Sequence, residues 1–77
     1  MSQTMSENIL GSILEQLKEK SYAHFENSRI DIRVMKINVN TPIYLLCGKK
    51  YDNDGNWKEF ARAFFDVDTL AWFINSL

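Results

Sequence analysis

The chain has 77 residues, of which 45% are hydrophobic and 25% are charged, a composition typical of a folded domain and not of a disordered segment. Nine basic and ten acidic residues give a net charge of −1, which excludes the strongly basic surface of most nucleic-acid binders and the strongly acidic surface of a DNA mimic. We expect one domain over residues 1–77, with residues 1–3 disordered, near the lower size limit for a stable core.

The cysteine content and the N-terminus both bear on the compartment. A single cysteine, Cys47, excludes an internal disulfide, whereas small secreted domains usually need such bridges. The N-terminus lacks the basic start and apolar run of a signal peptide, and no window approaches the roughly 20 apolar residues of a membrane span. These features favour a cytoplasmic location.

Residues 4–20 have the pattern of an amphipathic helix. Thr4 and Glu7 have the spacing of a capping box, in which two side chains satisfy free backbone N–H groups at the helix start. Apolar residues recur at helical spacing at Ile9, Leu10, Ile13, Leu14 and Leu17. We expect this stripe to pack on a sheet, and the alternative is a groove-binding or dimerising helix.

Residues 21–28 are expected to form a connection, with Tyr22 and Phe25 tucked against the edge of the core. His24 is the only histidine of the chain. Because no cysteine or carboxylate cluster accompanies it at ligand spacing, the sequence favours a surface residue over a metal ligand.

From residue 29 the hydrophobic period changes to two, which is typical of a strand. The apolar positions are Ile30, Ile32 and Val34 and then, one residue out of phase, Met35, Ile37 and Val39. Such a slip turns the later side chains to the other face unless a β-bulge absorbs it, so we expect a bulge near Val34–Met35. Residues 40–42 then make a turn, with Pro42 at the start of the next strand.

Residues 43–50 are apolar on both faces at first, which is typical of a central strand. Ile43, Leu45 and Cys47 point one way, and Tyr44 and Leu46 the other. Cys47 is expected to be a small buried hydrophobic residue, because a reactive thiol needs a basic or helix-terminal neighbourhood.

Residues 52–56 carry the strongest turn signal in the chain, and their acidic spacing does not match an EF-hand loop. Residues 57–65 fit a strand or a helix, and the tight turn before them favours the strand. With Asp54 and Gly55 as a two-residue loop, the expected cross-strand pairs are Lys50–Glu59, Gly48–Ala61 and Leu45–Phe64.

Asp66 or Asp68 is expected to cap a final helix, since a carboxylate is favourable at the positive end of a helix dipole. One face of that helix carries Leu70, Phe73, Ile74 and Leu77. Trp72 projects well away from this face. It is therefore either covered by the rest of the fold or presented to a partner.

The element order predicts an α+β fold: a helix, a three-stranded antiparallel meander and a helix, with both helices on one face of the sheet. The alternative is a helix, a two-stranded hairpin and two helices, if residues 57–65 are helical. The side chains expected to be largely buried are Leu14, Leu17, Leu45, Leu46, Phe64, Leu70, Phe73 and Ile74.

Residues suited to catalysis are sparse. An enzyme needs converging groups, such as a nucleophile with a base, a carboxylate pair or a phosphate-binding loop. One histidine, one cysteine and three scattered glycines supply none of these, and helix capping explains Asp66 and Asp68 better than acid–base chemistry does. We therefore expect no enzymatic activity, no cofactor and no metal.

Three classes of function remain. The first is a small non-enzymatic protein-binding inhibitor or adaptor. The second is a nucleic-acid-binding module with Tyr44 or Tyr51 as stacking partners and with basic side chains on the sheet, namely Arg29, Arg33, Lys36, Lys49, Lys50 and Arg62. The third is a homodimer that buries its second sheet face.

We favour the protein-binding inhibitor, since tryptophan and arginine are enriched at binding hot spots. Both strand faces are apolar between residues 43 and 46, and two short helices can cover only one of them. The predicted partner-binding residues are Trp72, Arg62, Tyr44, Tyr51, Lys49 and Lys50.

The C-terminal segment ARAFFDVDTLAWFINSL, residues 61–77, resembles the close of some very small phage-encoded anti-CRISPR proteins. In those proteins a last strand ending in Ala-Arg-x-Phe runs through an acidic turn into a helix ending in Trp-Phe-x-x-Leu. The matching residues, with a one-residue shift before Trp72, are Ala61, Arg62, Phe64, Leu70, Trp72, Phe73 and Leu77. The resemblance implies a stoichiometric inhibitor that blocks a CRISPR effector complex in the cytoplasm of a bacterial host.

Overall fold

The computed structural model describes the backbone of residues 5–77 and the side chains of residues 9–77. The elements in chain order are helix α1 (Met5–Glu19), strands β1 (Tyr22–Glu26), β2 (Ile30–Asn38), β3 (Pro42–Tyr51) and β4 (Trp57–Phe64), and helix α2 (Val67–Asn75). The expected disorder of residues 1–3 and the expected capping box of Thr4 and Glu7 lie outside the described part of the chain. Neither of these two helices is long and apolar enough to cross a membrane.

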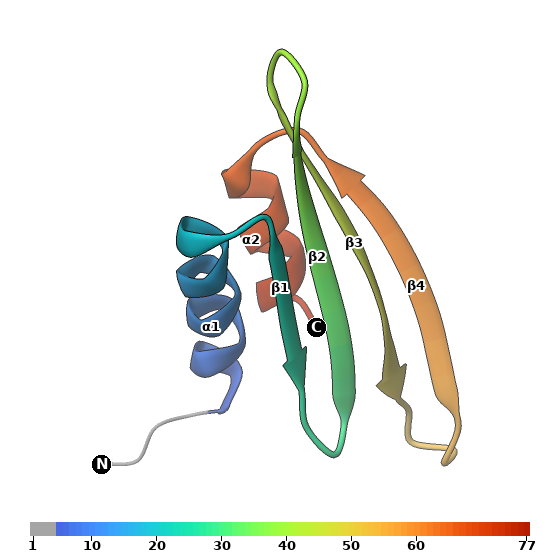
Figure 1. Cartoon of the computed structure of the whole chain (residues 1–77). Helices are drawn as coiled ribbons and strands as arrows, with labels where there is room; N and C mark the ends of the chain where they lie inside the picture. The colour runs from blue at the N-terminus through green and yellow to red at the C-terminus, as the bar shows by residue number, and fades with distance from the viewer. Residues whose placement is uncertain (1–4) are drawn as a thin grey trace.

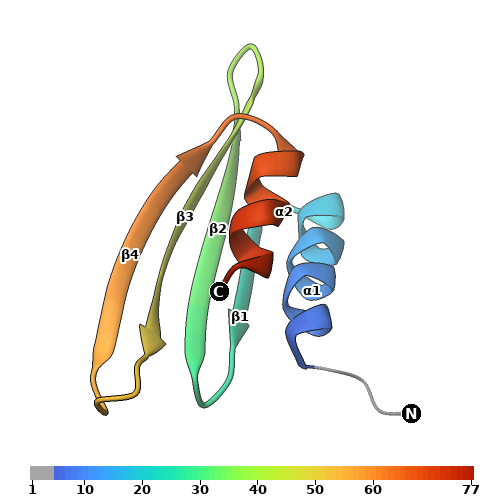
Figure 2. The same cartoon turned by 180° about the vertical axis from the view of Figure 1, so that it is seen from behind.

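The molecule has two layers, an antiparallel sheet and a pair of helices (Figure 1). The strands follow the order β1-β2-β3-β4 in the sheet. Seen from behind, both helices again lie on the same side of it (Figure 2). The predicted α+β class is confirmed, as is a strand and not a helix from residue 57.

The sheet has four strands and not the predicted three, because residues 22–26 form β1 and not a connection. This strand pairs with β2 along its whole length. The side-chain oxygen of Asn27 makes the turn between them by accepting hydrogen bonds from the backbone N–H groups of Arg29 (2.8 Å) and Ile30 (3.0 Å). With only Ala23 and Phe25 facing the helices, so short a strand gives little alternation to detect in the sequence.

Strand β2 runs without the bulge predicted near Val34–Met35, since it keeps one register with β3 from end to end. Ile30, Ile32 and Val34 face the helices and are buried, whereas Met35 and Ile37 point to the opposite face and are exposed. The phase change in the sequence therefore marks the point in β2 where the apolar side chains switch from the helix-facing side of the sheet to the other side. It does not mark a bulge with an extra residue.

The β3–β4 hairpin is one residue out of the predicted register. Tyr51 pairs with Trp57, which leaves residues 52–56 as the loop in place of a two-residue turn. The carboxylate of Asp52 organises this longer loop by accepting hydrogen bonds from the backbone N–H groups of Asp54 (2.9 Å) and Asn56 (3.0 Å).

The corrected register decides which side chains face the helices. Phe64 lies opposite Tyr44 and not opposite Leu45, so its ring points into the core. Leu45 lies opposite Ala63 on the other face. A shift of one residue has this effect because successive strand residues point to opposite faces.

The core lies between the sheet and the helices, where Ile13, Ile32, Leu46 and Leu70 are almost completely buried. Of the predicted core residues, Leu17, Leu46, Leu70 and Ile74 are buried, and Leu14, Phe64 and Phe73 are half-buried. The prediction that Leu45 and Cys47 are buried is wrong. Leu45 is 42% exposed, and Cys47 is exposed as well. Both residues occupy positions of β3 that face away from the helices.

Asp66 caps helix α2, as one of the two predicted candidates. Its carboxylate accepts hydrogen bonds from the backbone N–H (2.8 Å) and the hydroxyl (2.9 Å) of Thr69. These bonds, the backbone one first, hold the pKa of Asp66 below its ordinary value of 3.8. The predicted packing face of α2 is confirmed, since Leu70 and Ile74 are buried on it.

The burial of Leu70 makes a stability prediction. Its side chain has no exposed area, so Leu70→Ala should lower the free energy of unfolding by about 2–5 kcal/mol. The half-exposed Leu45 is the matched control, and Leu45→Ala should move the denaturation midpoint far less. Urea denaturation followed by circular dichroism measures both variants. Equal losses of stability would contradict the packing of α2 on the sheet.

The cap at Asp66 makes a prediction about pH. Because the pKa of Asp66 is lowered in the folded state, the stability that its ionised form contributes is complete above the unfolded pKa near 3.8 and is lost as the pH falls through the folded pKa. The Tm of Asp66→Asn should therefore lie below that of the unaltered protein at pH 7, and the two should converge as the pH falls from 3.8 through the lower folded pKa. Asp68→Asn is the control, because it removes a charge from the same turn but not the carboxylate that accepts from Thr69. A difference in Tm that does not depend on pH would contradict this role.

Candidate functional site

The face of the sheet turned away from the helices, here called the open face, is formed by alternate residues of all four strands. Cross-strand pairing arranges its side chains in three rows that run from β1 to β4. The apolar row is Tyr22, Met35, Leu45 and Ala63; the mixed row is His24, Arg33, Cys47 and Ala61; the charged row is Glu26, Asp31, Lys49 and Glu59. The open face therefore changes from apolar to charged along the strands.

The apolar row leaves large side chains accessible to solvent. Met35 is 48% exposed, Leu45 42% and Tyr22 40%. Beyond them along the strands, Ile37 pairs with Ile43, which extends the apolar surface. An open hollow lies beside the row, lined among others by Tyr22, Met35, Leu45 and Ala63, because the alanines of β4 are short beside these neighbours.

An aromatic pair lies next to the charged row, at the β3–β4 hairpin. The rings of Tyr51 and Trp57 meet edge to face, with their centroids 5.0 Å apart. The ammonium group of Lys49 lies 5.1 Å from the centre of the Trp57 ring, within reach of a cation–π interaction. These contacts anchor Lys49 in the charged row, where it lies between Asp31 and Glu59.

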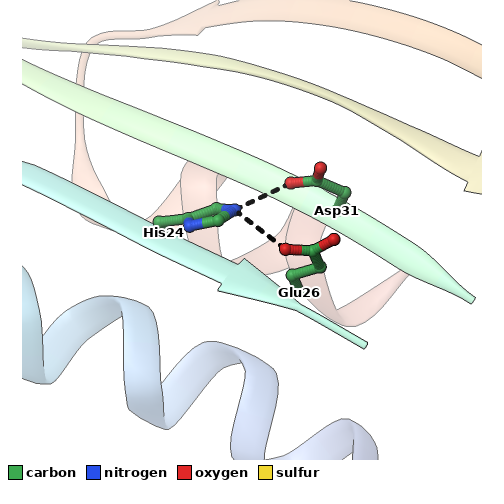
Figure 3. A group of neighbouring side chains, drawn as sticks. All are labelled: His24, Glu26 and Asp31. Atoms are coloured by element: carbon green, nitrogen blue, oxygen red, sulfur yellow. Dashed lines mark hydrogen bonds and ion pairs between the residues drawn. The ribbon is translucent and has the colours of Figure 1, made fainter. Parts of the chain in front are cut away.

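A cluster of three side chains occupies the β1–β2 end of the charged row (Figure 3). The Nε2 atom of His24 lies 2.9 Å from Oδ1 of Asp31 and 3.9 Å from Oε1 of Glu26. The second oxygen of Asp31 lies 4.0 Å from the guanidinium group of Arg33. The sequence placed His24 in a connection with no carboxylate cluster at ligand spacing, whereas the structure places it on β1 beside the carboxylates of Glu26 and Asp31.

The predicted partner-binding residues do not form one site. Tyr51 and Lys49 lie on the open face, and Lys50 is an exposed residue at the end of β3 whose position faces the helix side. Tyr44, at 5% exposure, belongs to the core, which leaves its ring unable to stack on a ligand in this structure.

Arg62 and Trp72 lie on the helix side of the sheet. The guanidinium of Arg62 stands 5.5 Å from the ring centre of Phe73 in α2. The sequence left open whether the fold covers Trp72 or presents it to a partner. The side chain is 70% exposed, so the fold does not cover it. Its part in binding stays a prediction.

Sequence reasoning missed Tyr22, Met35 and Leu45 as surface residues. The signal was present, because the phase change in β2 and the two apolar faces of β3 both place hydrophobic residues on a second face. The expected bulge would have turned Met35 to the buried face of β2. Tyr22 was expected in a connection at the edge of the core, and Leu45 was expected in the core.

Cys47 and His24 share the mixed row, but β2 separates their strands. Two strand spacings of about 4.8 Å put their backbones about 10 Å apart, and Arg33 lies between them in the row. This separation is too large for a hydrogen-bonded thiol–imidazole pair, which needs about 3 Å between donor and acceptor.

The exposure of Cys47 makes a prediction that reverses the expectation from the sequence. In the folded protein Cys47 should react with a thiol reagent at a rate close to that of the denatured protein, because its position faces solvent. A colorimetric disulfide reagent with and without denaturant measures both rates. Protection of the thiol in dilute solution would show that the open face is covered.

Protein-family models, curated protein sequences and solved structures were compared with this chain, and none matches it.

Proposed function

We propose that this protein is a non-enzymatic binding module that recognises another protein through its open face. The observation that supports this most directly is the apolar row, which leaves three large hydrophobic side chains about half exposed in a domain whose helices cover the opposite face. Contiguous apolar surface of this kind is typical of interaction sites.

The size of the apolar row is adequate for a useful affinity. Full burial of one such side chain contributes about 1.5–3 kcal/mol, so completing the burial of a half-exposed one contributes about 1 kcal/mol. Three side chains then supply about 3 kcal/mol, or roughly a hundredfold in the dissociation constant. The charged row beside them adds specificity more than affinity.

The C-terminal resemblance supplies the class of partner. The resembling segment, residues 61–77, includes Ala61 and Ala63 of the open face and the exposed Trp72 of α2. We therefore propose a stoichiometric inhibitor of a bacterial CRISPR effector complex, carried by a phage or mobile element. The open face and Trp72 are the surfaces available for that contact.

A second candidate function is self-association through the same face, supported by the order of side chains in each row. In such a dimer the open faces of two copies meet, and the two-fold axis lies between the two sheets, parallel to the strands and above the gap between β2 and β3. The axis places each row against the same row of the other copy in reverse order, as a closed dimer requires. Tyr22 would then stand over the small Ala63 of the other copy, and Asp31 over Lys49. The one unfavourable meeting is that of Glu26 with Glu59.

The charges of the open face disfavour nucleic acid. Its charged and mixed rows contain two basic residues, Arg33 and Lys49, against three acidic ones, Glu26, Asp31 and Glu59. Phosphate binding depends on an excess of positive charge. The remaining basic residues do not gather on this face.

Binding can be tested with a charged substitution in the apolar row. Leu45→Asp should weaken the affinity for a purified CRISPR effector complex by at least about thirtyfold, the loss expected when a hot spot is removed. Val39→Asp is the matched control, because Val39 is 71% exposed but lies in the β2–β3 turn. Biolayer interferometry measures the affinities, and Trp72→Ala tests the surface of α2.

Three results would separate the candidates. Light scattering that gives twice the mass of one chain, lost in Leu45→Asp, would favour self-association. Retention of nucleic acid that falls steeply with salt would favour a nucleic-acid module. If a folded Leu45→Asp keeps every interaction of the unaltered protein, the open face is not the binding site.

A further inference from the structure

We propose that His24, Glu26 and Asp31 form a binding site for a divalent first-row transition ion, with Zn²⁺ as the best match. The three side chains come together on β1 and β2, at the charged end of the open face (Figure 3). The site is distinct from the apolar row and does not depend on what binds there.

Strand geometry makes the three side chains converge. His24 and Glu26 are two residues apart on β1, so they project from the same face. Asp31 lies directly opposite Glu26 on β2, where paired side chains begin about 5 Å apart. Two ligands from one strand and one from its neighbour surround a single point above the sheet.

The distances suit an ion. Zinc binds imidazole nitrogen and carboxylate oxygen at about 2.0–2.2 Å, which places neighbouring ligand atoms roughly 3.0–3.5 Å apart. Nε2 of His24 is 2.9 Å from Oδ1 of Asp31 and 3.9 Å from Oε1 of Glu26, and all three ligand atoms lie within 4.8 Å of one another. A small rotation of the Glu26 side chain, which is 62% exposed, closes the remaining gap.

The electrostatics favour a cation at this point. Like charges directly opposite each other on neighbouring strands are destabilising, and Glu26 and Asp31 are such a pair. The guanidinium of Arg33 approaches the Asp31 oxygen that faces away from His24, at 4.0 Å. It offsets part of the negative charge and leaves Oδ1 directed at the imidazole.

The main chain of His24 is held in place from the other side. Its N–H donates to the side-chain oxygen of Gln16 in α1 (3.0 Å), and its carbonyl accepts from the side-chain nitrogen of Gln16 (3.0 Å). Asp31 is constrained as well, with only 13% of its side chain exposed. Two of the three ligands therefore start close to their binding geometry, which lowers the entropy cost of capturing an ion.

The ligand set selects the class of metal. One imidazole and two carboxylates suit Zn²⁺ and its first-row neighbours, whereas Ca²⁺ and Mg²⁺ prefer oxygen ligands throughout. Three protein ligands leave at least one position of a tetrahedral ion open.

The test uses Zn²⁺ itself on a Cys47→Ser background, since the exposed thiol of Cys47 could bind metal independently. His24 is the only histidine, so its two ring C–H signals in the proton NMR spectrum need no further assignment. Zn²⁺ should shift these signals with saturable, one-to-one behaviour and raise the Tm. Lowering the pH should weaken binding, because protons compete with the ion for the imidazole.

Two substitutions decide the outcome. Asp31→Asn keeps the shape of the side chain and should weaken Zn²⁺ binding by more than about tenfold, whereas Glu59→Gln removes an acidic group from the same row outside the cluster and should leave it unchanged. Circular dichroism confirms that both variants fold. If millimolar Zn²⁺ leaves the His24 signals unmoved, or if Asp31→Asn binds as tightly as Glu59→Gln, the site does not exist.

Discussion

Burial of one sheet face against α1 and α2 is the interaction on which the rest of this structure depends. Ile13 of α1, Ile32 of β2 and Leu70 of α2 lose all contact with solvent where the layers meet. Two helices of about 10 Å diameter side by side are about as wide as four strands spaced 4.8 Å apart. The helices of the described chain therefore suffice for one face of the sheet, and the other face is left to solvent or to a partner.

The open face is graded along the strands, because each row joins four strands at one height. The hydrophobic side chains gather toward the β2–β3 turn, and the carboxylates gather toward the β1–β2 and β3–β4 turns. The proposed protein-binding surface and the proposed metal site thus occupy opposite ends of one face. Arg33, in the row between them, contacts Asp31 at the polar end and lines the hollow at the apolar end.

Polar side chains decide where the elements end and how they align. Asn27 closes the β1–β2 turn, Asp52 closes the β3–β4 loop and Asp66 begins α2, each by accepting hydrogen bonds from backbone N–H groups. Gln16 performs the corresponding task for the edge strand β1, since it satisfies both backbone groups of His24. Each side chain fixes local geometry that hydrophobic burial alone leaves open.

The sequence by itself determined the two helices with their packing stripes, an aspartate cap for α2 at Asp66 or Asp68, the strand start at Pro42 and the α+β class. All of these depend on local periodicity or on capping chemistry within a few residues. Only the tertiary structure decided the register of β4, the place of β1 in the sheet and the exposure of Leu45 and Cys47. A strand pattern shows that two faces differ, but which face the helices cover depends on contacts between distant segments. The contact between His24 and Asp31 could not be predicted from the sequence either. The pairing of β1 with β2 brings these side chains together, and β1 was not predicted.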